Sequence, residues 1–141
     1  MVEKKTGKYV KEVNTRIGRH DEITGPLISM TSDKDYGDKN FTMIWEPITQ
    51  PFLMVEEHHK HDFDQFLCFI GTDTSNLKDL GGEVELTLSE DRKETEKHVI
   101  TSSTTVFIPE GFYHAPLNFK KVDKPFLFIN IFFTQDYKKL S

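Results

Sequence analysis

The chain has 141 residues, of which 36% are hydrophobic and 29% charged, a composition typical of one soluble globular domain rather than a disordered or membrane protein. Its formal net charge is -5, and it has no basic stripe, which argues against a nucleic-acid partner because phosphate neutralisation supplies most of that affinity. We see neither a signal-peptide segment nor an apolar run long enough to span a bilayer, so we expect no membrane partner. With Cys68 as its one cysteine, we expect a reducing, cytoplasmic setting.

The first part of the chain, residues 1–38, is polar, contains scattered glycines and shows weak periodicity. We expect it to form an N-terminal arm and loop that is partly ordered and packs on the rest of the chain. Residues 39–141 have a different character, with short apolar runs separated by turn residues, and should form the main domain.

Within this main domain, runs rich in aromatic and β-branched residues are bounded by Pro, Gly or Asp, which is typical of strands. The predicted strands cover residues 41–45, 52–59, 66–70, 83–88, 104–108 and 126–133.

The segments between these strands carry turn signals. Glu46-Pro47 should stop the first strand, residues 72–80 read as a surface loop, and residues 90–97 read as the tip of a hairpin. Residues 126–133 are apolar at nearly every position, which suits a strand covered on both faces or one at a subunit contact. Because no long amphipathic helix is evident, the pattern indicates an all-β sandwich or barrel.

A pair of histidines, His59 and His61, lies at the end of the second predicted strand. Residues two apart on a strand point to the same face, so the two imidazoles could grip one metal ion. Gln65 would share that face if the register continued through residues 62–64. An H-x-H pair alone is a weak signal, and it more often represents two surface histidines at a strand end.

A second element strengthens the metal hypothesis. Residues 109–118 read P-x-G-x-x-H-x-x-x-N, and the Pro and Gly should reverse the chain directly after the strand at 104–108. This reversal could bring His114 beside the first pair, giving three imidazoles from two separate strand regions.

These two segments carry a family resemblance. Residues 59–65, followed by Gly71, resemble the first motif of the cupin superfamily, in which H-x-H precedes a Glu or Gln ligand, a strand and a Gly. Residues 109–118 resemble the second motif, lacking only the Gly that often precedes its Pro. The chain is thus similar to small single-domain cupins, which implies an all-β, jelly-roll-like barrel (a double-stranded β-helix) over residues 39–141, with the arm at 1–38 packed against it.

The resemblance also implies a metal site at one mouth of the barrel, and four residues match the family's ligand positions. These ligands would be His59, His61, Gln65 and His114. They would hold one divalent transition metal ion, either Fe, Zn, Ni, Mn or Cu, and the ligand types do not decide among these. Gln65 stands where Glu is more frequent in the family, so the site would remain more positive. We therefore expect an anionic ligand such as a carboxylate or an enolate.

As to function, the resemblance implies an enzyme acting on a small anionic or oxygenated organic molecule, of the dioxygenase or the isomerase or lyase type. No catalytic residue beyond the ligands can be named. The alternative is a non-catalytic small-molecule binding or sensing protein that uses the same metal. A purely structural metal fits less well, because structural sites are usually closed and rich in Cys.

The resemblance further implies a homodimer, for which residues 126–133 are the candidate contact. We expect the loop at 72–80 to form either a lip over the mouth or a part of the dimer contact.

Overall fold

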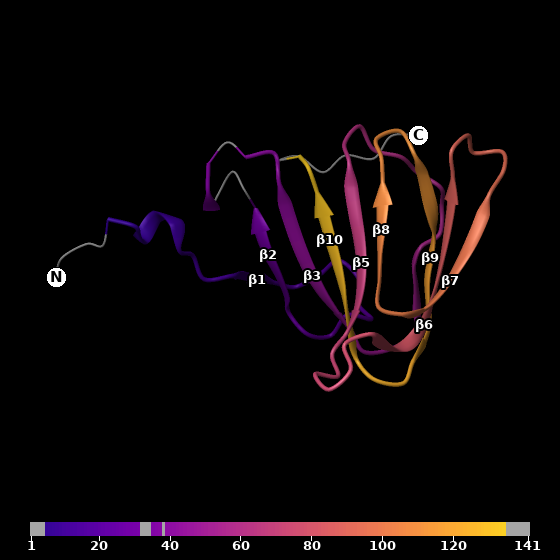
Figure 1. Ribbon diagram of the computed structural model, residues 1–141, viewed down its shortest axis with the longest axis horizontal. Coiled ribbons are helices and arrows are strands. Elements are labelled where there is room, and N and C mark those ends of the chain that lie inside the picture. The colour runs from indigo at the N-terminus through magenta and orange to yellow at the C-terminus, as the bar shows by residue number, and fades with distance from the viewer. Residues whose placement is uncertain (1–4, 32–34, 38, 135–141) are drawn as a thin grey trace.

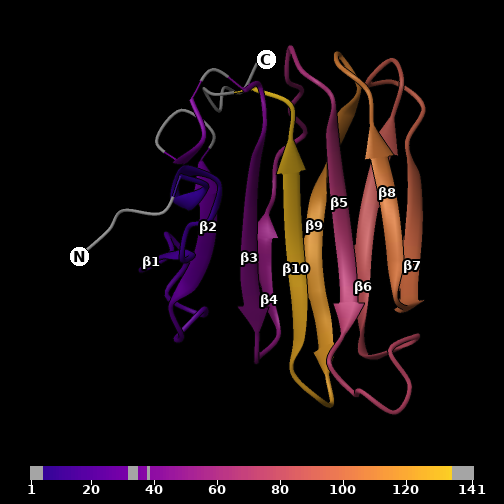
Figure 2. The same cartoon turned by 60° about the vertical axis from the view of Figure 1, so that its left-hand side comes forward.

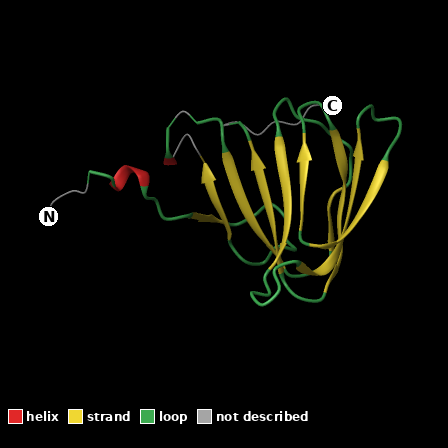
Figure 3. Ribbon diagram, viewed as in Figure 1, coloured by secondary structure: helices red, strands yellow, loops and turns green. Residues whose placement is uncertain are grey.

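The computed structural model describes residues 5–31, 35–37 and 39–134, which form ten strands in two antiparallel sheets and a short 3-10 helix (Figures 1 and 3). The elements are η1 (Gly7–Tyr9), β1 (Asn14–Arg16), β2 (Leu27–Thr31), β3 (Thr42–Ile48), β4 (Phe52–Val55), β5 (Gln65–Gly71), β6 (Asp79–Ser89), β7 (Glu96–Ser102), β8 (Thr104–Ile108), β9 (Tyr113–Val122) and β10 (Phe126–Phe132). No helix in these ranges has the length and apolar character needed to cross a membrane.

The two sheets lie face to face. One has the strand order β1-β2-β3-β10-β5-β8 and the other β4-β9-β6-β7, and Figure 2 shows β3, β10 and β5 in front of β4 and β9. Strands that are neighbours in a sheet are therefore often distant in sequence, as in a jelly roll. This arrangement confirms the all-β prediction, and it adds β1 and β2, from the N-terminal segment, to the edge of the larger sheet.

The core fills the space between the sheets. In β10, Phe126, Phe128 and Phe132 are at most 3% exposed and point inward, while Leu127, Ile129 and Ile131 are half-buried on the outer face, as the two-residue period of a strand requires. Phe128 stacks on Phe69 of β5, with ring centroids 5.2 Å apart, and Phe119 of β9 packs against both from the opposite sheet. The apolar run at 126–133 thus forms a central strand, paired on both edges with β3 and β5.

Several strand boundaries differ from the sequence expectation. β3 continues through Pro47 to Ile48, because β2 pairs with β3 only as far as Trp45 and Pro47 has a single neighbouring strand, β10. β4 ends at Val55 rather than at residue 59. β9 was not predicted, because Pro116 interrupts its sequence.

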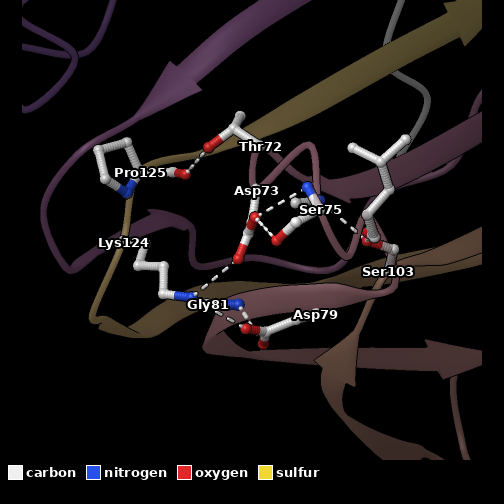
Figure 4. Close-up of polar contacts among 10 residues, drawn as sticks. Thr72, Asp73, Ser75, Asp79, Gly81, Ser103, Lys124 and Pro125 are labelled. Carbon is white, nitrogen blue, oxygen red and sulfur yellow. Dashed lines mark hydrogen bonds and ion pairs between the residues drawn. The ribbon is translucent and has the colours of Figure 1, made fainter.

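The loop at 72–80 lies at the Gly71 end of β5, away from Gln65, and Figure 4 shows what holds it there. Thr72 Oγ1 donates a hydrogen bond to the Pro125 carbonyl at 2.6 Å, and Lys124 Nζ lies 3.4 Å from Asp73 Oδ2. Hydrogen bonds from Ser75 lower the pKa of Asp73, with Lys124 contributing further. The expectation of a lip over the metal-site mouth is therefore wrong, because the loop is fastened to the β9–β10 turn.

Candidate metal centre

Three histidines from the two sequence motifs meet at one end of the sheets. The ligand nitrogens of His59, His61 and His114 all lie within 4.8 Å of one another. Their residues are 7%, 2% and 5% exposed, respectively. The prediction that the chain reversal brings His114 beside the other two is thereby confirmed.

Backbone hydrogen bonds hold these segments together. His59 and His114 form an isolated antiparallel bridge, in which each amide donates to the other's carbonyl, at 3.3 and 3.1 Å. The Gly111 amide donates to the His61 carbonyl at 2.8 Å, and the φ of Gly111 is +79°, a conformation that favours glycine. Because these bonds use main-chain atoms, they leave the imidazoles to face one another.

Gln65, the first residue of β5, is 1% exposed and lines the same cavity as His59 and His114. Its Nε2 donates a 2.7 Å hydrogen bond to Oδ1 of Asn130. Its Oε1 is buried and has no hydrogen-bond partner in the described structure. A buried carbonyl oxygen without a partner is costly, and a metal ion would satisfy it.

Asn130 was not identified from the sequence, although a signal was present. It is the one polar residue of β10, which otherwise reads Phe-Leu-Phe-Ile-Ile-Phe. Asn130 also lies on the inward face and lines the cavity. Because metal-ligating side chains are commonly oriented by a hydrogen bond from a neighbour, an isolated polar residue on a core strand indicates such a role.

Aromatic packing fixes the wall behind the histidines. The His61 ring stacks on Phe63 with centroids 4.6 Å apart and an interplanar angle of 21°, and Phe63 packs in turn on Phe132. Tyr113, next to His114, has Lys60 and Arg92 over its ring at 5.3 and 5.8 Å. Tyr113 is not among the residues that line the cavity.

The cavity has a volume of about 660 Å³ and runs between the sheets from the histidines to β1 and the segment after it. Arg16, Arg19 and Glu46 line its other part. Burial raises the pKa of the Glu46 carboxyl, and the charges of Arg16 and Arg19 partly offset that rise. None of these three residues was singled out in the sequence, because only the pairing of β1 with β2 brings the arginines to the cavity.

The donor set fits a transition metal ion. Three imidazole nitrogens and an amide oxygen suit Fe, Zn, Ni, Mn or Cu better than Mg or Ca, which prefer oxygen-rich sites. The described residues thus offer a buried, nitrogen-rich group adjoining a cavity large enough for a small organic molecule.

Comparison with known proteins supports the fold. No family model and no curated protein matches the sequence. Among solved structures, one concerned with the Mn(II) centres of Bacillus subtilis oxalate decarboxylase matches 90% of this chain at 12% identity with a TM-score of 0.59. A point variant of the same enzyme matches 92% at 10% identity with a TM-score of 0.60. A structure describing the substrate binding mode of oxalate decarboxylase matches 83% at 15% identity with a TM-score of 0.57.

These matches cover less than a third of the neighbours' length, 29%, 30% and 28% in the same order. At such low identity, the likeness concerns the fold and not the activity.

Proposed function

Because the chain has the cupin fold and a buried group of three histidines beside a cavity, we propose that it is a metal-dependent enzyme acting on a small anionic or oxygenated organic molecule. The observation that carries the proposal is the convergence of His59, His61 and His114, whose ligand nitrogens lie within 4.8 Å of one another.

In this proposal one divalent transition metal ion binds to the three imidazoles and to Oε1 of Gln65. When bound, the ion supplies Lewis-acid or redox chemistry. All four ligands are neutral, so the protein does not reduce the charge of the ion, and an anionic substrate is favoured at its remaining coordination positions.

The reaction belongs, in this proposal, to the dioxygenase or the isomerase and lyase types. Support for an anionic substrate comes from the neighbours named as oxalate decarboxylases, enzymes of a small dicarboxylate. The second candidate function is binding or sensing of a small molecule without turnover, which the same cavity also supports. NMR of a ligand incubated with the protein distinguishes the two functions. An enzyme converts the ligand to a product, whereas a binding or sensing protein leaves it unchanged.

The first test is the metal content of the protein, purified without a His-tag and without oxygen, measured by elemental mass spectrometry. We expect near-stoichiometric metal in the wild type and almost none in the His59→Ala/His114→Ala variant, because two of the three imidazoles are lost. The matched control is His98→Ala, which removes a surface imidazole 46% exposed in its side chain and should retain the metal.

The identity of the metal refines the reaction type. Iron would favour the dioxygenase type, whereas zinc or nickel would favour isomerase or lyase chemistry. Failure of the wild type to bind Mn(II), Fe(II) or Zn(II), even after reconstitution, would overturn the proposal and leave a cavity that binds ligands without metal.

A further inference from the structure

The cavity has two chemically different ends. At one end lie His59, Gln65 and His114, all at most 7% exposed. At the other end lie Arg16 and Arg19, whose side chains reach the cavity from the exposed N-terminal segment. A ligand in this cavity therefore meets a buried nitrogen-rich group and a solvent-accessible pair of guanidinium groups.

Strand register sets the separation of the two ends. Gln65 is paired with Phe132, which is paired with Thr42, so these three residues form one row across the larger sheet. Glu46, beside the arginines, lies four residues further along β3 on the same face, which corresponds to about 13 Å at the usual rise of a strand. The charged end is thus well separated from the metal end.

The charged end carries a surplus of positive charge. Two guanidinium groups face the single carboxylate of Glu46, and no other lysine, arginine or acidic residue lines the cavity within the described ranges. Within the same ranges, the side chains of Arg16 and Arg19 make no hydrogen bond or ion pair. The guanidinium groups therefore keep their donors for a ligand, and guanidinium suits carboxylate or phosphate.

Between the two ends the walls are mixed. In the larger sheet Asn130 is paired with Ile44 on one side and with Leu67 on the other, so this row carries both polar and apolar side chains. Met54 and Leu117 of the smaller sheet also line the cavity and add apolar surface. The part of a ligand that passes this section can therefore be a hydrocarbon chain or ring packed on the apolar side chains.

We propose that the cavity binds an elongated organic acid, with a metal-chelating oxygen group at the histidines and a second anionic group against Arg16 and Arg19, joined by an apolar spacer. The part of this proposal that concerns the metal rests on the proposed function. A two-carbon diacid such as oxalate is too short to reach both ends, so the preferred substrate differs in length from that of the named structural neighbours.

The test compares suberate, an eight-carbon dicarboxylate, with octanoate, which has the same length and lacks the second carboxylate, and with oxalate. Dissociation constants are measured by isothermal titration calorimetry on Mn(II)-loaded and metal-free protein. We expect suberate to bind the loaded wild type about tenfold more tightly than octanoate, the ratio that one charge-assisted contact supplies, and also more tightly than oxalate.

The Arg16→Gln/Arg19→Gln variant should lose this preference, because it removes both guanidinium groups. The control variant Lys11→Gln/Lys93→Gln removes the same two charges from exposed positions outside the cavity and should keep it. Circular dichroism establishes that each variant is folded before the titration.

The outcomes separate this inference from the proposed function. Equal affinity for suberate and octanoate in the wild type, or an unchanged preference in the arginine variant, overturns the inference even if both acids bind only to metal-loaded protein. A preference for suberate that persists in metal-free protein, without any effect of Mn(II), supports the charged end and counts against the metal-dependent function. Absence of measurable suberate binding also overturns the inference.

Discussion

Gln65 and Asn130 form a pair in which one side chain sets the orientation of the other. The amide nitrogen of Gln65 donates to Asn130 Oδ1, and this bond determines that Oε1, not Nε2, is the atom left without a partner. An amide that turned over would present its nitrogen, which cannot bind a cation. Asn130 is therefore a positioning residue for the proposed metal site rather than a ligand.

We predict that Asn130→Ala weakens Mn(II) binding about 10- to 100-fold, the usual effect of losing a hydrogen bond that orients a metal ligand. Asn130→Asp keeps an oxygen that accepts from Gln65 Nε2 and should retain most of the affinity. Competition against a fluorescent chelator measures the dissociation constants.

The control for this experiment is Asn118→Ala, which alters a half-buried asparagine of β9 that does not line the cavity. If Asn130→Ala and Asn118→Ala bound Mn(II) equally well, Asn130 would have no part in orienting Gln65.

The individual residues also show how much of the site could be predicted from the sequence. His59, His61 and His114 could be identified because each of the two motifs is a short local pattern and the residues Pro109 and Gly111 indicate a chain reversal. Their role as metal ligands, with Gln65, remains a prediction. Arg16 and Glu46 could not be identified, since they share the cavity only after β1 has paired with β2 and β2 with β3.

At the level of elements, strands with a clear two-residue period or a continuous apolar run were predicted, as in β5 and β10. β9 was missed because Pro116 and charged residues near its end resemble a turn, although β4 and β6 pair with it on both edges. The end of β4 was misplaced because its pairing with β9 shifts register between Leu53 and Val55 and resumes only at the isolated bridge between His59 and His114. These boundaries depend on contacts between distant segments, which local patterns do not encode.

The end of β5 offers a test of close packing between elements. A Cβ atom added at Gly71 would overlap the Asp79 carbonyl, where the loop at 72–80 returns to the sheet. We predict that Gly71→Ala lowers the free energy of unfolding by about 1–3 kcal/mol, because backbone must shift to make room. Chemical denaturation monitored by circular dichroism measures the change.

Gly25→Ala is the matched control, because a Cβ there would meet only Pro47 Cγ at an ordinary 3.7 Å. If both variants had the same free energy of unfolding, the close approach of Gly71 to the Asp79 carbonyl would not contribute to stability.

At the scale of the whole molecule, the outer face of the larger sheet carries a row of apolar side chains. In one cross-strand row Ile28 is paired with Trp45, Trp45 with Ile129, and Ile129 with Cys68. Ile28, Trp45 and Ile129 are only half-buried although β10 is a central strand. We propose that a second copy of the chain covers this face, because this row carries no charged side chain and burying it would remove apolar surface from water.

Sedimentation velocity should therefore reveal a dimer at micromolar concentration. Ile129→Lys places a charge in the centre of the face and is expected to shift the population to monomer without unfolding the chain. Val99→Lys, at a residue 57% exposed on the smaller sheet, should leave the dimer intact. A wild type that is monomeric throughout the concentration range would rule out this interface.

The main-chain bridge between His59 and His114 affects how a metal ion would enter and leave the proposed site. Because amide and carbonyl groups join the two segments, the fold itself brings together the imidazoles of the proposed metal site. Chelation and refilling can then proceed under native conditions, so one preparation can be loaded in turn with manganese, iron, zinc or nickel. Divalent metals bind nitrogen-rich sites in one general order of affinity, so the ion held by the proposed site in a cell would depend on metal availability as well as on the geometry of the site.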